Sequence, residues 1–177
     1  MSALSTDYIN YLAGQKYFED GDYEAARPVF ALLALDDFED ASEWVKKTDY
    51  AQAAVLFDGG DLYGAYLSFK KLGAYSDSTE RMAACTTPAP ANGTIYFDGG
   101  FASSTSELVI DGSSITQASY FKLYSGDTLV STFWVSPAGS VTLGLRSGTY
   151  TIKEAWGDPW FGEEVMFGDE GYYTIMT

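Results

Sequence analysis

The sequence predicts an α+β protein of two domains, in which helical hairpin repeats are followed by an antiparallel β-sandwich. Three observations support this prediction: a repeated helical pattern in the first half, a change to period two in the second, and a shift in composition between them. Residues 1–87 hold 6 of the 18 Gly and 1 of the 5 Pro, whereas residues 88–177 hold 12 Gly and 4 Pro. Gly and Pro are unfavourable inside helices and frequent in turns, so the halves follow different structural rules.

The repeat lies in the first half. The segment GDYEAARPVF at 21–30 aligns with GDLYGAYLSF at 60–69, an offset of 39 residues. Apolar residues recur at helical spacing, as Tyr50, Ala53 and Phe57 do, which indicates one apolar face per helix. The Gly-Asp pair that opens each segment predicts a tight reversal in which the Asp caps the next helix. We expect helices over residues 7–20, 23–35, 40–58, 62–72 and 77–85.

A second signal marks two of these helix starts. Asp40 precedes Glu43 by three residues, and Asp77 precedes Glu80 by three. This spacing is typical of a capping box, in which each side chain accepts a hydrogen bond from the other residue's backbone amide. We therefore expect both acidic pairs to cap their helices.

The first half resembles a tetratricopeptide-like repeat that is common in Gram-positive bacterial proteins. The resemblance rests on Gly-Asp-Tyr at 21–23 and on the later elements Phe38-Glu39-Asp40-Ala41 and Tyr75-Ser76-Asp77-Ser78. It implies a helical domain over 1–85, with repeat 1 at 8–39, repeat 2 at 40–76 and a capping helix at 77–85. Repeats of this kind serve as scaffolds for many partners, so the resemblance implies a fold and no particular activity.

The offset of 39 also relates Phe18 to Phe57 and Phe30 to Phe69, so we expect all four rings in the core of the repeats. Cys85, near the end of the last helix, is expected to be a small buried apolar residue. The Pro- and Ala-rich segment 86–92 is short and stiff, and we expect a semi-rigid hinge there.

From 93 to 177 the apolar period is two, and turn residues recur about every ten positions. Seven or eight short strands with this spacing indicate an antiparallel sandwich. The expected strands are 94–97, 107–110, 119–125, 128–135, 140–145, 149–156, 163–167 and 172–176.

The stretch VSPAGSVTLGLRSGTYTIKEAWGDPWFGEEVMFGDEGYY at 135–173 is the most distinctive in the chain. Its Pro-Gly turn, Gly-x-Tyr strand and Trp-x-Gly-Glu loop resemble a β-domain that follows such helical repeats in bacterial envelope-type proteins. The Gly-x-Tyr part also resembles transthyretin-like and immunoglobulin-like sandwiches. The resemblance implies a sandwich and brings no catalytic residues.

The loop that follows the sixth expected strand is rich in large rings. Trp156, Trp160 and Phe161 bracket a turn that contains Asp158. Two interpretations stay open: the rings plug one end of the sandwich, or they form an exposed platform, with Asp158, for a sugar or a peptide.

Composition argues against several functions. The formal charge is −15 and is spread over both halves, which disfavours binding to nucleic acid and to anionic membranes. Histidine is absent and Cys85 is the single cysteine, so we expect no catalytic triad, no metal site and no cofactor. Glu163 and Glu164 are adjacent and would point to opposite faces of a strand, which does not suit a glycosidase.

We therefore expect a non-catalytic protein-interaction or scaffold module with a protein or peptide partner. The alternative is a carbohydrate-binding or cell-wall accessory protein that uses the loop 156–161. Exposure of Trp160 separates them, because a buried ring favours the first hypothesis and an exposed ring the second. The resemblance implies an exported or envelope protein whose export signal lies outside this chain, with a cytoplasmic protein as the alternative. No apolar run is long enough to insert into a membrane.

The last expected strand contains no charged residue and no proline, so we expect an unprotected sheet edge at 172–177. Three outcomes are open: the strand is central and paired on both sides, the chain is truncated, or the edge pairs with a second copy. The charge of −15 opposes self-association, which favours a monomer.

Overall fold

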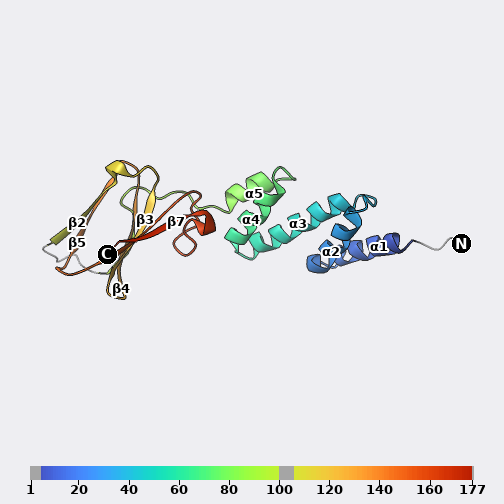
Figure 1. The fold of residues 1–177 in the computed structure, drawn as a ribbon, viewed down its shortest axis with the longest axis horizontal. Coiled ribbons are helices and arrows are strands. Elements are labelled where there is room, and N and C mark those ends of the chain that lie inside the picture. The colour runs from blue at the N-terminus through green and yellow to red at the C-terminus, as the bar shows by residue number, and fades with distance from the viewer. Residues whose placement is uncertain (1–4, 100–105, 177) are drawn as a thin grey trace. The chain divides into compact units, whose positions relative to one another are not determined.

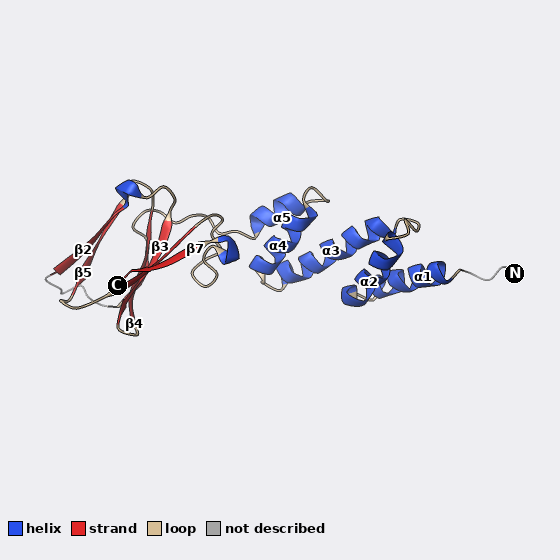
Figure 2. Ribbon diagram, in the orientation of Figure 1, coloured by secondary structure: helices blue, strands red, loops and turns tan. Residues whose placement is uncertain are grey.

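The computed structural model describes residues 5–99 and 106–176. Internal contacts divide the chain into two compact units, Met1–Thr86 and Thr87–Thr177. Helices form the first unit and antiparallel strands form the second (Figure 1). The predicted α+β class, with helices first and strands later, is confirmed (Figure 2).

The first unit contains five α-helices among its described residues, and each packs against the next along the chain. The carboxylates of Asp22 and Asp61 accept hydrogen bonds from the amides of Ala25 and Gly64 at 3.0 and 2.9 Å. Both predicted Gly-Asp caps are therefore present. The helices are α1 (Thr6–Glu19), α2 (Tyr23–Ala34), α3 (Ala41–Asp58), α4 (Leu62–Leu72) and α5 (Ser78–Ala84).

Tyr11 on α1 is the centre of the first aromatic network. Its ring meets Phe30 and Phe38 edge-on, each at a centroid distance of 6.0 Å. Its hydroxyl donates to the carboxylate of Asp40 and accepts from the indole Nε1 of Trp44 at 3.0 Å. The Trp44 ring in turn stacks on Phe30 at 5.1 Å. One tyrosine thus joins α1, α2 and the start of α3.

Tyr50 on α3 repeats this arrangement. Its ring meets Phe69 and Tyr75 edge-on at 5.8 and 6.0 Å, and its hydroxyl donates to Asp77. The Arg81 guanidinium takes the place of the tryptophan in the first network and lies 5.9 Å from the centroid of Phe69. The two copies of the sequence pattern therefore make matching contacts.

The two networks replace the predicted capping boxes, which are absent from the described helices. Asp40 and Asp77 precede α3 and α5, but neither carboxylate makes a hydrogen bond to a helix amide. Tyr11 and Tyr50 hold these carboxylates instead, and the bond from Tyr50 is the main cause of a lowered pKa at Asp77. The spacing of acidic residues predicted the helix starts correctly and the role of the side chains wrongly.

The core of the first unit contains the predicted phenylalanines to different degrees. Phe30 and Phe69 are fully buried, whereas Phe18 and Phe57 are half-buried. Cys85 is buried as predicted, and its burial raises the pKa of the thiol.

The second unit contains seven described strands in two antiparallel sheets. A five-stranded sheet has the order β1-β4-β3-β6-β7, and a two-stranded sheet pairs β2 with β5. The facing side chains share one core, which includes Phe121 and Phe133 of the larger sheet and Val141 and Leu143 of the smaller. The strands are β1 (Ile95–Asp98), β2 (Ser106–Asp111), β3 (Ser119–Ser125), β4 (Thr128–Val135), β5 (Ser140–Leu145), β6 (Thr151–Trp156) and β7 (Tyr172–Met176).

The strand predicted at 163–167 does not form, and the segment is a loop. Gly162 and Met166 have φ of +93° and +57°, which interrupts an extended conformation. The amide of Met166 donates to the carbonyl of Gly162 at 2.7 Å, so the segment closes on itself. The prediction that Glu163 and Glu164 alternate across a strand is therefore wrong.

Both Thr87 and Asn92 of the segment predicted as a hinge, 86–92, are hydrogen-bonded to residues of the second unit. The Thr87 amide donates to the carbonyl of Trp160 at 2.8 Å. The side chain of Asn92 accepts from the Ser136 amide at 2.9 Å and donates to the Ser140 carbonyl at 3.1 Å. The ordered second unit therefore begins before β1.

The last described strand, β7, lies at the border of the five-stranded sheet (Figure 1). Among the described strands it pairs with β6 alone, so the first of the three open outcomes, a central strand paired on both sides, is excluded for these strands. Thr177, which completes the predicted edge, lies outside the described residues.

Because Phe69 is fully buried in contact with Tyr50, Phe69→Ala should lower the free energy of unfolding of the helical unit by about 3 to 5 kcal/mol. Val55→Ala is the control, since that side chain is 58% exposed. Urea unfolding followed by far-ultraviolet circular dichroism measures both. Equal, small losses in the two variants would contradict the described core.

Candidate functional site

The candidate site lies on the face of the five-stranded sheet that points away from the smaller sheet, here called the outer face. Side chains alternate along β3, so Phe121 and Leu123 enter the shared core while Tyr120, Lys122 and Tyr124 lie on the outer face. Cross-strand partners share a face, which places the β6 and β7 residues opposite them on the outer face too.

A loop of residues 157–171 between β6 and β7 covers one end of the outer face. Trp160 and Phe167 from this loop pack on Tyr120 and Trp134. The ring centroid of Trp160 is 5.1 Å from those of Tyr120, Trp134 and Phe167. Trp160 is 3% exposed and Trp134 is 1% exposed. The cluster of Tyr120, Trp134, Ala155, Trp160 and Phe167, here called the aromatic plug, is a second core.

Glu163 fastens the same loop to the sheet. Its carboxylate accepts hydrogen bonds from the hydroxyl groups of Tyr120 at 2.6 Å and Thr132 at 3.1 Å. Burial raises the pKa of Tyr120, and the hydrogen bond to Glu163 raises it further. Tyr96 on β1 also lies against the plug, and its pKa is raised mainly by burial.

Beyond the plug the outer face is open, and a hollow of about 360 Å³ lies over β3, β6 and β7. Lys122 and Lys153 are direct cross-strand partners in it. Ile175 on β7 is opposite Lys153 and is 63% exposed. The lining residues are Tyr120, Lys122, Tyr124, Lys153, Glu154, Ala155, Met166, Tyr173, Thr174 and Ile175.

The two lysines lie over aromatic rings and lack acidic partners among the residues that the structure describes. The Lys153 Nζ is 4.8 Å from the centroid of Tyr124, and the Lys122 Nζ is 5.6 Å from that of Tyr120. Neither ammonium group forms an ion pair with any residue in the described ranges 5–99 and 106–176. Residues 88–177 contain three basic residues, so two of the three face each other here.

This arrangement suits an anionic group. Like charges directly opposite each other on a sheet are destabilising, and an anion between them would remove the repulsion. The tyrosine rings and Ile175 supply apolar surface beside the charges. A carboxylate carried by an apolar or extended chain fits both parts of the hollow.

The residues predicted as a ligand platform do not meet on one surface. Trp160 is in the plug and offers no open face, whereas Trp156 lies on the opposite face of β6 and stacks on Tyr172 at 5.5 Å. Asp158 is exposed in the turn, and Phe161 is half-buried.

The lysine pair was not predicted from the sequence. Lys122 and Lys153 sit in the alternating segments YFKLY and TIKEA, so each could have been assigned to a strand face. Their juxtaposition depends on the pairing of β3 with β6, which are separated along the chain by β4 and β5. Charge counting cannot show this pairing.

Two other kinds of feature are absent from the part of the chain that the structure describes. None of its helices has the length and apolar character needed to cross a membrane. No cluster of three or more Asp, Glu or Cys side chains in these residues is arranged to hold a metal ion.

Comparison with known proteins adds no relative. No protein-family model matches the chain, and no curated protein or solved structure is significantly similar to it.

Glu163 and Glu164 offer a matched pair for testing the plug. Glu163→Ala should lower the free energy of unfolding of the second unit by about 1.5 to 3 kcal/mol, because two buried hydroxyl groups lose a charged acceptor. Glu164 is exposed, and Glu164→Ala should change the free energy of unfolding of the second unit by less than about 0.5 kcal/mol. Tryptophan fluorescence during urea unfolding measures both, and similar losses would show that the loop is not fastened through Glu163.

Proposed function

We propose that the protein is a non-catalytic interaction module, and that its second unit binds an anionic group of a protein partner in the hollow over Lys122 and Lys153. The observation that carries the proposal is the cross-strand pairing of these two lysines without an acidic partner among the described residues. The helical unit acts as a tetratricopeptide-like scaffold, which its two matching aromatic networks support.

The burial of Trp160 favours a protein partner over a carbohydrate. A sugar-binding platform needs an exposed ring, and the central ring of the predicted platform is 3% exposed. The open hollow offers two cations and apolar surface beside a border strand, which suits a peptide chain. The resemblance of the sequence to envelope proteins favours an exported or envelope-associated setting, which stays a prediction.

The negative charge of the whole chain bears on where an acidic segment can bind. At −15 the protein repels anions in general, but charges at the surface are screened beyond about 8 Å at physiological salt. An acidic segment is therefore attracted to the lysine pair in spite of the negative charge of the whole chain.

The test uses a fluorescently labelled oligoglutamate peptide as the probe and measures its binding by fluorescence anisotropy at physiological salt. The double variant Lys122→Gln/Lys153→Gln should bind at least about tenfold more weakly than the wild type, a loss of about 1.4 kcal/mol. Gln keeps a polar side chain of similar length while removing each charge.

Arg146→Gln is the matched control, because it removes the third positive charge of the same unit from outside the hollow. It should change the affinity by less than about threefold. The affinity of Arg146→Gln is also compared with that of each single lysine variant. Equal losses of affinity would mean that net charge, and not the hollow, determines binding, and the proposal would fail.

A further inference from the structure

The two border strands of the five-stranded sheet differ in how well their edges are protected. The pairing of β1 with β4 slips between Ile95 and Phe97, and β1 ends at the charged Asp98. The pairing of β7 with β6 runs without a slip from Tyr172 to Met176, and β7 contains no charged residue and no proline. A regular, uncharged edge is a template for a further strand.

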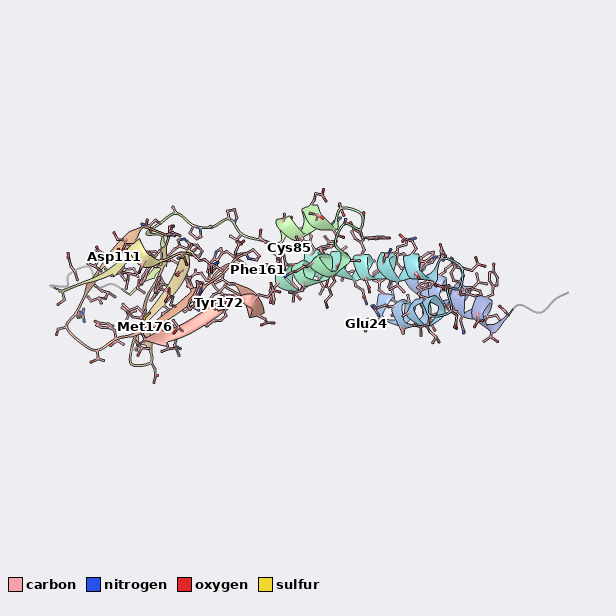
Figure 3. All side chains as sticks on the ribbon, turned by 45° about the horizontal axis from the view of Figure 1, so that its top comes forward. Glu24, Cys85, Asp111, Phe161, Tyr172 and Met176 are labelled. Carbon is pink, nitrogen blue, oxygen red and sulfur yellow. The ribbon has the colours of Figure 1, made fainter. Side chains whose placement is uncertain are left out.

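Both faces of β7 also expose large side chains. Tyr173 and Ile175 lie on the outer face, and Tyr172 and Met176, which Figure 3 labels, lie on the opposite face. The exposed fractions are 49% for Tyr173 and 63% for Ile175 on the outer face. They are 60% for Tyr172 and 44% for Met176 on the opposite face. A strand added beside β7 would place its own side chains against these four on both faces.

The charges beside β7 differ between its two faces. On the outer face Lys122, Lys153 and Ile175 form one cross-strand row, so the residue of an added strand opposite Ile175 would extend this row. It would lie about 10 Å from the Lys153 backbone, twice the strand spacing, which a lysine and an acidic side chain can bridge together.

On the opposite face the equivalent neighbour is acidic. Glu154 pairs with Thr174, so an added residue opposite Thr174 would meet a carboxylate across the strand. An acidic side chain is therefore favoured on the outer face of an added strand and disfavoured on the other.

We propose that β7 takes up an extended segment of a partner protein as a sixth strand, with an acidic side chain of that segment against Lys153 and Lys122. This inference rests on the proposed function and names the form of the partner. A second copy of the chain fits less well: its β7 carries no acidic residue, and its approach joins two chains of charge −15. The lysine pair would then stay without an anion.

The experiment selects ligands from a phage-displayed library of linear peptides against the full chain. The enriched peptides should be rich in β-branched or aromatic residues and should share one acidic position, because a single position of the added strand lies in the row of Lys153 and Lys122. One enriched peptide is then synthesised. Its binding should slow amide hydrogen exchange along β7, because amides that point toward the added strand become hydrogen-bonded to it.

An edge-blocked variant then tests the mode of binding. This variant carries a neutral strand of alternating Thr and Val, joined after Thr177 by an Asn-Gly turn. The added strand should fold back and occupy the edge of β7, and both lysines are unchanged. A Gly/Ser extension of equal length is the matched control. The selected peptide should bind the edge-blocked variant at least about tenfold more weakly than the control.

The outcomes separate this inference from the proposed function. If the selected peptides bind the edge-blocked variant and the control equally but lose affinity in Lys122→Gln/Lys153→Gln, the hollow binds the anion and strand addition is wrong. If the double lysine variant binds as the wild type does, the proposed function fails as well. The acidic-segment proposal would also be overturned if no peptide were enriched. It would be overturned as well if the wild type formed a dimer that the blocking strand converts to a monomer.

Discussion

The packing of Trp160 against Tyr120 and Trp134 is the contact on which the second unit's functional surface depends. It draws the 157–171 loop over one end of the outer face, where Glu163 fastens it to two hydroxyl groups. Most large apolar side chains on that end are thereby removed from water, a favourable term of about 1.5 to 3 kcal/mol for each. The loop stops short of the Lys122 and Lys153 row, so the same contact defines where the open hollow begins.

The helical unit depends on a different contact, the tyrosine hydroxyl that holds a carboxylate at the next helix start. Tyr11 and Asp40 form it once, and Tyr50 and Asp77 form it again. The long helix α3 takes part in both networks, through Trp44 in the first and Tyr50 in the second. At the position of Trp44, the second copy carries Arg81, and both side chains cover the buried phenylalanine of their own copy.

Local signals predicted most elements, because helix and strand periods and Gly-Asp turns act over short distances. The helices and strands lie close to their expected ranges, and the caps at Asp22 and Asp61 are present. The errors arose where a distant partner decides the outcome. Asp40 is bound by a tyrosine 29 residues away, and Glu163 reaches residues of β3 and β4. The lysine pair was missed for the same reason, since only sheet pairing brings Lys122 and Lys153 together.

Lys122 and Lys153 are direct cross-strand partners and have no acidic partner among the described residues, and we propose that their repulsion costs stability that an anionic ligand restores. A double-mutant cycle with Lys122→Gln, Lys153→Gln and the double variant measures their coupling directly through the free energy of unfolding. We expect a repulsive coupling of about 0.2 to 1 kcal/mol that decreases with added salt. A coupling of zero, or an attractive one, would contradict it.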